Sequence, residues 1–105
     1  MPEPKRYRLG VSRRAAYQLR DHAAFAAQLD ERIALKLIDD YQEAAESLTY
    51  MPFRTPYLDS EMIPSGKYRK MLFGKWYLIL YKIQDDTVYI EYVIDGRQDY
   101  EWLIK

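Results

Sequence analysis

The sequence predicts an α+β fold with the order β-α-α-β-β-β, in which a helix hairpin packs on one face of a small, mainly antiparallel twisted sheet. Three observations lead to this prediction. A short alternating stretch near the N-terminus precedes two successive segments with helical periodicity. A proline-rich loop follows them, and three β-type runs separated by tight turns come last. The length of 105 residues suits one core, so we assign residues 1–105 to a single domain.

The N-terminal part predicts a strand that leads directly into a helix. Polarity alternates over Tyr7–Val11, and Ser12 is a good N-cap for a helix that begins at Arg13. Small apolar residues recur along this helix and predict a narrow buried stripe of Ala16, Leu19, Ala23 and Ala27. Leu29 and Asp30 form a break, so we expect Asp30 to cap a second helix and the two helices to lie antiparallel.

The second helix has the stronger pattern. Asp39, Asp40, Glu43 and Glu46 occupy its solvated side, and Pro52 is expected to end it. The apolar positions at three- and four-residue steps are Ile33, Ala34, Leu37, Ile38, Tyr41, Ala44, Ala45 and Leu48.

Three strands are expected near residues 68–73, 76–83 and 87–94, after an extended loop over residues 51–67 that wraps around the rest of the chain. Gly74-Lys75 predicts a two-residue hairpin turn in which glycine supplies a positive φ angle. Asp85-Asp86 predicts the second turn. In the last strand, strict alternation predicts two opposite sets, Val88, Ile90, Tyr92 and Ile94 against Tyr89, Glu91 and Val93.

Composition narrows the function classes. The chain has no cysteine, which excludes disulfides, thiolate metal sites and a cysteine nucleophile, and it has no apolar run that could span a membrane. We therefore expect a cytoplasmic protein without metal or cofactor. The net charge is zero but segregated: +5 over residues 1–20, −5 over 21–50, +5 over 65–82 and −4 over 83–105. This leaves room for a local positive patch.

Several local strings, in this order and spacing, resemble the RelE/ParE superfamily, the toxins of bacterial type II toxin–antitoxin modules. The resemblance covers about residues 6–102. The strings are Tyr7 to Ser12 leading into a helix, Leu48-x-x-Met51-Pro52, Tyr68-Arg69-x-x-x-Phe73-Gly74-x-x-Tyr77-x-Ile79-x-Tyr81, and Val93-Ile94-Asp95-Gly96-Arg97-Gln98-Asp99-Tyr100.

The resemblance implies a growth-inhibiting toxin that a cognate antitoxin protein neutralises by wrapping it with an extended or helical segment. RelE-like members cut messenger RNA at the ribosome without a metal, whereas ParE-like members poison DNA gyrase and are not nucleases. Fold alone does not choose between these activities. A non-toxic interaction domain of the same fold is a third hypothesis. A partner strand or a second copy of the chain, forming a homodimer, could cover the open sheet face and edge.

The nuclease hypothesis, which we rank first from the sequence, assigns residues to roles. Arg69 and Arg97 match arginines that RelE-like nucleases place around the scissile phosphate, and Tyr100 resembles their C-terminal tyrosine near the 2′-hydroxyl. These three groups are expected to converge on one open surface. Additional substrate-binding cations are Lys67, Arg54 and Lys75.

Each of these residues also has a purely structural interpretation. Arg69 could pair with Glu91 on a neighbouring strand, and Arg97 could pair with Asp95 or Asp99. Tyr100 could pack against the edge of the sheet. His22, the only histidine, is expected to have a structural or solvent-exposed role within the first helix.

Overall fold

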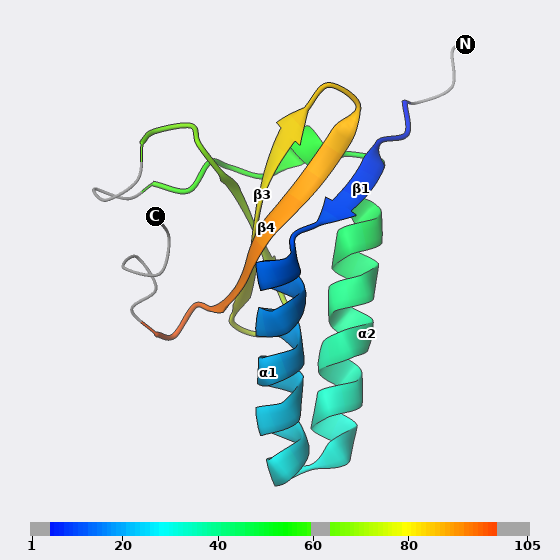
Figure 1. Ribbon diagram of the computed structural model, residues 1–105, viewed down its shortest axis with the longest axis vertical. Coiled ribbons are helices and arrows are strands. Elements are labelled where there is room, and N and C mark those ends of the chain that lie inside the picture. Colours follow the sequence, from blue (N-terminus) through cyan, green and yellow to red (C-terminus); the bar gives the residue numbers. More distant parts are fainter. Residues whose placement is uncertain (1–4, 60–63, 99–105) are drawn as a thin grey trace.

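Residues 5–59 and 64–98 are described in the computed structural model, and their elements confirm the expected α+β order. The elements are β1 (Arg8–Val11), α1 (Arg13–Leu29), α2 (Glu31–Ser47), a 3₁₀ helix η1 (Pro52–Arg54), β2 (Arg69–Phe73), β3 (Tyr77–Gln84) and β4 (Thr87–Asp95). The two long helices lie side by side as a hairpin that extends well beyond the sheet (Figure 1). In the described part of the chain, neither helix is long and apolar enough to cross a lipid bilayer.

Both helices begin at the caps that the sequence predicts. The Ser12 hydroxyl accepts a hydrogen bond from the backbone N–H of Ala15, and the Asp30 carboxylate accepts one from the N–H of Arg32. Asp30 also forms an ion pair with the Arg32 side chain, which holds the pKa of the Asp30 carboxyl below its usual value. The second helix ends at Ser47, earlier than expected, and Pro52 instead begins η1.

The buried stripe of α2 is confirmed except at Ile33, which is exposed, whereas that of α1 lies partly elsewhere. Ala15 and Ala26 are buried, and Leu19 and Ala23 pack against the core, but Ala16 and Ala27 are exposed. The helix is therefore rotated by about one position from the expected orientation. The reason is that α1 turns side chains toward the edge of a strand as well as toward the sheet face.

The four strands form one mixed sheet in the order β1-β4-β3-β2, in which β1 is parallel to β4 and the other pairs are antiparallel. The turn from β3 to β4 is the predicted Asp85-Asp86 pair, with a positive φ angle at Asp85. Between β2 and β3 the turn has three residues, because Phe73 pairs with Tyr77. Gly74 has the expected positive φ of 60°.

A β-bulge at Glu91 overturns the simple alternation that we expected for β4. Tyr81 pairs with Ile90 and Leu80 pairs with Tyr92, so Glu91 is an extra residue without a partner on β3. Val93 consequently joins Ile90 on the helix-facing side of the sheet, and Tyr92 lies on the opposite side. Such a bulge depends on strand pairing, which a single strand's sequence does not reveal.

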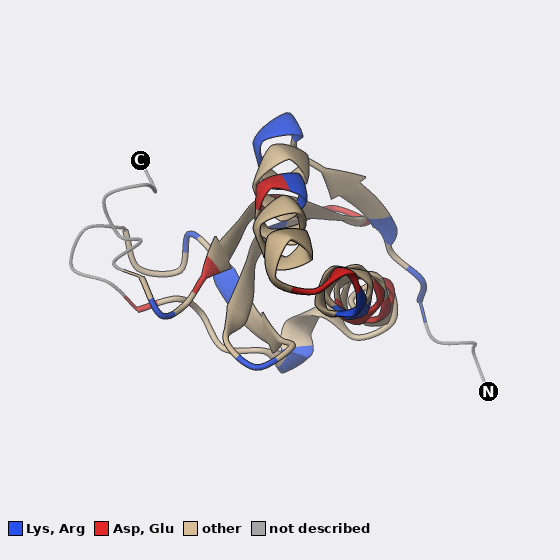
Figure 2. Ribbon diagram, turned by 90° about the horizontal axis from the view of Figure 1, so that it is seen from below, with Lys and Arg blue, Asp and Glu red and all other residues tan. Residues whose placement is uncertain are grey.

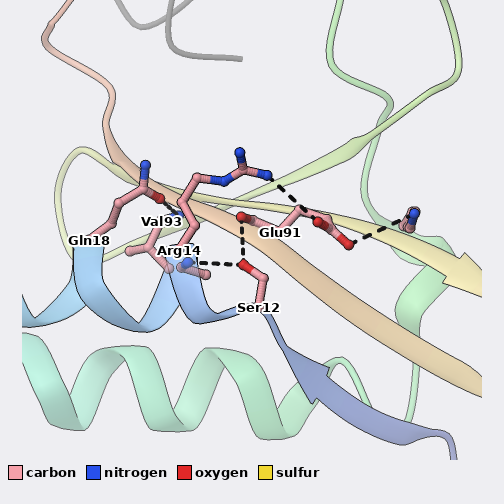
Figure 3. A network of polar contacts seen from close by, with 7 residues as sticks. Ser12, Arg14, Gln18, Glu91 and Val93 are labelled. Atoms are coloured by element: carbon pink, nitrogen blue, oxygen red, sulfur yellow. Dashed lines mark hydrogen bonds and ion pairs between the residues drawn. The ribbon is translucent and has the colours of Figure 1, made fainter. Parts of the chain in front are cut away.

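Strand β1 ends at Val11, and beyond it side chains of Ser12 and α1 form hydrogen bonds with the backbone of β4. The Ser12 hydroxyl donates to the carbonyl of Glu91 at 2.9 Å, and the Gln18 side-chain carbonyl accepts from the N–H of Val93 at 2.8 Å (Figure 3). His22 Nε2 lies 3.0 Å from the Val93 carbonyl, to which it donates. His22 therefore has the structural role that the sequence predicted.

The sheet is covered on both faces. The main core lies between the helix hairpin and the sheet, with Leu37, Tyr41, Leu48, Ile79 and Tyr81 among its largest buried side chains. A second cluster on the opposite face brings the loop residue Leu58 and Tyr68 against Leu80, Tyr92 and Ile94. The loop after α2 thus covers the sheet face opposite the helices, which we had considered open from the sequence.

Candidate functional site

The end of β4 forms a rigid rim built around Asp95. Asp95 is only 7% exposed, and its carboxylate accepts hydrogen bonds from the Arg97 backbone N–H, from Nε at 3.0 Å and from Nη2 at 2.7 Å. The Arg97 guanidinium also lies 3.9 Å from the ring centroid of Trp76. The pairing with Arg97 that the sequence allowed is therefore present, with Asp95 as the partner.

This pair makes the stability of the chain depend on pH. The hydrogen bonds from Arg97 hold the pKa of Asp95 below its usual value, and the pKa of the Arg97 guanidinium is raised in turn by Asp95. A carboxyl with a lowered pKa stabilises the folded state above its unfolded pKa of about 4, and this contribution is lost as pH falls through the lower folded value.

Asp95→Asn is expected to reduce the free energy of unfolding by about 1–2 kcal/mol at pH 7, because the charge-assisted hydrogen bonds from Arg97 weaken. Thermal unfolding followed by circular dichroism at pH 7, 5, 4 and 3 measures the difference from the wild type. The gap in melting temperature should stay constant down to about pH 5 and close below about pH 4. An unchanged gap at pH 3 would contradict this assignment.

Arg69 anchors the loop that follows α2. Its guanidinium donates to the backbone carbonyls of Phe53 and Thr55, and it lies 5.3 Å from the ring centroid of Phe53 and 4.2 Å from that of Tyr57. The Tyr81 hydroxyl strengthens the same attachment by donating to the carbonyl of Pro52 at 2.7 Å. Arg69 makes no ion pair with Glu91, whose carboxylate lies 3.9 Å from Arg14 and 3.8 Å from Lys82 instead.

The expected convergence of Arg69 and Arg97 on one surface is wrong. Arg69 begins β2 and pairs with Tyr81, whereas Arg97 follows the end of β4 that lies beside Tyr77 and Phe73. Arg69 lies beside the middle of β3, four strand positions from the Phe73 end of β2, which is about 13 Å along the strand alone. Tyr100, the third residue of the predicted site, lies outside the described residues.

The predicted cations fall into two separate groups. Lys67 and Arg69 line a small pocket of about 280 Å³ together with Tyr57 and Tyr81. Arg54, Lys75 and Arg97 line a groove of about 1060 Å³ on the other side of β2. Within residues 5–59 and 64–98, no three His, Asp or Glu side chains gather in a way that could hold a metal ion.

The groove, which we call the hairpin groove, is the feature that sequence reasoning missed. One wall comes from the facing sides of α1 and α2, and the other comes from β2 and the turn that follows it. Its apolar surface includes Leu29 and Ile33, which are 70% and 51% exposed, and Leu72, which is 59% exposed. Ile33 was expected in the core, and Leu29 was interpreted only as part of a break. Large exposed apolar side chains around one groove are typical of a protein–protein interface.

Charge is distributed unevenly around the hairpin groove. Acidic residues are concentrated on α2, whose solvated side is visible in the view from below (Figure 2). Of the two that line the groove, Asp40 forms an ion pair with Lys36, with Oδ2 and Nζ 3.1 Å apart. The groove is also lined by Arg54, whose Nη2 donates to the Ser47 hydroxyl of α2 at 2.6 Å, and by Lys75 in the turn after β2. The groove therefore combines apolar surface with both acidic and basic side chains.

Comparisons with known proteins agree with this fold. A family model described as the ParE toxin of the type II toxin–antitoxin system parDE matches residues 9–100. A solved structure of the chromosomal ParDE TA system from P. aeruginosa is similar, with a TM-score of 0.72 and 19% sequence identity. The alignment covers 87% of this chain and 97% of that one. No curated protein matches the chain in sequence.

Proposed function

Because the chain belongs to the ParE toxin family of type II toxin–antitoxin systems, we propose that it arrests growth by inhibiting DNA gyrase, without nuclease activity, and that a cognate antitoxin neutralises it. Gyrase acts in the cytoplasm, so the proposal also places the chain there. The sequence alone ranked ribosome-dependent RNA cleavage first. The positions of Arg69 and Arg97 favour gyrase inhibition over RNA cleavage instead.

The separation of Arg69 from Arg97 is the observation that carries this proposal. Metal-independent RNA cleavage needs cations around one phosphate, together with a base and an acid within hydrogen-bonding reach. Here Arg69 pairs with Tyr81 in the middle of β3, whereas Arg97 follows the end of β4 that pairs with Tyr77, and this separation of about 13 Å along the strands argues against one phosphate held by both. Each is also engaged already, Arg69 with two loop carbonyls and Arg97 with the Asp95 carboxylate.

Gyrase inhibition is tested directly with the purified wild-type chain. We expect it to stop gyrase from supercoiling a relaxed plasmid in the presence of ATP, and to leave messenger RNA intact on programmed ribosomes. Adding the antitoxin encoded beside it should restore supercoiling, which controls for contaminating inhibitors. Cleaved message beside unaffected supercoiling would reverse the proposal and support a ribosome-dependent nuclease.

A further inference from the structure

A row of alternating cations and aromatic rings runs past η1, away from the hairpin groove. The Lys5 ammonium lies 4.9 Å from the ring centroid of Tyr7, and the rings of Tyr7 and Phe53 meet edge to face with their centroids 6.0 Å apart. The Arg69 guanidinium, which contacts both Phe53 and Tyr57, continues the row.

A second pair lies beside the start of this row. The N–H of Tyr7 donates to the carbonyl of Thr49 at 2.7 Å, and the Arg6 guanidinium lies 4.9 Å from the ring centroid of the next residue, Tyr50. Three separate segments of the chain thus contribute to one surface. We call it the aromatic–basic surface, and its exposed members are Lys5, Arg6, Tyr50, Phe53, Tyr57 and Arg69.

The rings of this surface are open to solvent. Tyr50 is 48% exposed, Phe53 is 59% exposed and Tyr57 is 50% exposed. Contact with water is unfavourable for large aromatic groups, and several of them gathered on one surface indicate that a ligand covers them. Their flat faces suit a ligand that is itself flat.

Carboxylates do not neutralise the cations of the row. Within residues 5–59 and 64–98, neither Lys5, Arg6 nor Arg69 forms an ion pair. The pocket of about 280 Å³ beside Tyr57 adds Lys67 and Lys82, and no acidic side chain from the described part of the chain lines it. Lys82 alone has a carboxylate nearby, that of Glu91 at 3.8 Å. The surface therefore favours an anion.

Nucleic acid combines the two properties that this surface requires. Proteins that hold unpaired strands stack the bases on aromatic side chains and neutralise the phosphates with lysine and arginine. The centre of a protein–protein interface is, by contrast, depleted of charge. Here cations separate the rings from one another, so the chemistry favours a nucleic-acid strand over a protein.

We propose that the aromatic–basic surface binds DNA with unpaired bases, which stack on Tyr50 and Tyr57 while the phosphates lie near Lys5, Arg6 and Lys67. The choice of DNA rests on the function proposed above, because gyrase acts on DNA. The toxin would then contact the DNA as well as the enzyme. No cleavage is involved, since Arg69 is held by the carbonyls of Phe53 and Thr55 and serves to orient the rings.

Fluorescence anisotropy tests the binding with the purified full chain and a labelled single-stranded DNA of about 12 nucleotides. We expect binding that weakens as salt is added. If Lys5, Arg6, Lys67 and Lys82 each neutralise one phosphate, the logarithm of the affinity should fall with the logarithm of the salt concentration with a slope of about −3. Lys67→Ala should reduce this slope by about 0.7.

Variants of Tyr50 test the stacking. Tyr50→Ala should weaken binding about tenfold, whereas Tyr50→Phe keeps the ring and should change it by about twofold at most. Helix α1 offers a matched control, because Tyr17 is also 50% exposed and has the Arg20 guanidinium 4.7 Å from its ring centroid. Tyr17→Ala and Arg20→Ala should bind DNA like the wild type.

Three outcomes would overturn the proposal. Equal losses in Tyr50→Ala and Tyr17→Ala would show that binding does not involve this surface. Tighter binding of an RNA of the same sequence would replace DNA by RNA as the ligand. Absence of binding to any oligonucleotide, with weakened binding of Tyr50→Ala to gyrase alone, would identify a protein as the occupant. Inhibition of supercoiling by the wild-type chain is measured separately: inhibition without DNA binding would refute this inference alone, and DNA binding without inhibition would refute the proposed function alone.

Discussion

Replacing Arg69 by alanine is expected to lower the free energy of unfolding by about 3 kcal/mol. The variant loses two charge-assisted hydrogen bonds, to the carbonyls of Phe53 and Thr55, and two contacts with aromatic rings. The loop that covers the second face of the sheet is then held mainly by the Tyr81 hydroxyl and by Leu58. Urea unfolding followed by fluorescence measures the loss.

Two further variants make the Arg69 result specific. Arg69→Lys keeps the charge but not the planar group that reaches both carbonyls, so it should recover less than half of the lost stability. Lys70→Ala, one position along the same strand, has no side-chain hydrogen bond or ion pair to lose among the described residues and should cost about 0.5 kcal/mol or less. An Arg69→Ala chain with wild-type stability would contradict the role of Arg69 in anchoring the loop.

Gly96→Ala is expected to lower the free energy of unfolding by about 2–3 kcal/mol. A Cβ atom at this position would lie 2.6 Å from the backbone carbonyl oxygen of Trp76, closer than real Cβ contacts. The Gly96 N–H donates to that same carbonyl at 2.7 Å, so relief of the clash would stretch a hydrogen bond and shift Asp95 and Arg97. Differential scanning calorimetry compares the two chains.

Gly66→Ala is the matched control for the Gly96 prediction. Gly66 has a positive φ of 79°, but nothing lies within 4 Å of the position of its Cβ. The substitution should cost about 1 kcal/mol through backbone strain alone. If Gly96→Ala lowered the free energy of unfolding no more than this control does, the short distance to the Trp76 carbonyl would not be the reason for glycine at position 96.

Local patterns were sufficient to predict the elements of the fold. The 3.6-residue period of α2, the caps Ser12 and Asp30, and the turn at Asp85 depend on neighbours in sequence, and each is confirmed. The errors concern features set by distant partners. The bulge at Glu91 exists only in the pairing of β4 with β3, and Ala16 turns outward because α1 also caps the edge of β4.

The candidate site was harder to predict for the same reason. From the sequence, Arg69 could bind a phosphate or hydrogen-bond to a loop. Only the folded structure shows that its guanidinium donates to the carbonyls of Phe53 and Thr55. Asp95 is two residues from Arg97, so that pair was within reach of sequence reasoning. The hairpin groove could not be predicted from the sequence, because apolar periodicity does not reveal that Leu29 and Ile33 are exposed to solvent.

The helix hairpin contacts the sheet over part of its length, from Ser12 to Ala23 along α1 and from Leu37 to Leu48 along α2. Ser12, Gln18 and His22 tie α1 to β4, whereas the turn at Asp30 lies beyond the sheet (Figure 1). The two helices are thus held by the sheet at one end and free at the end with the Asp30 turn. Movement of the hairpin is expected to increase toward that free end. We expect the part of the hairpin groove near the Asp30 turn to widen or narrow at a low cost in free energy, while the part next to the sheet stays fixed. Ligands of different width can then bind without distorting the sheet.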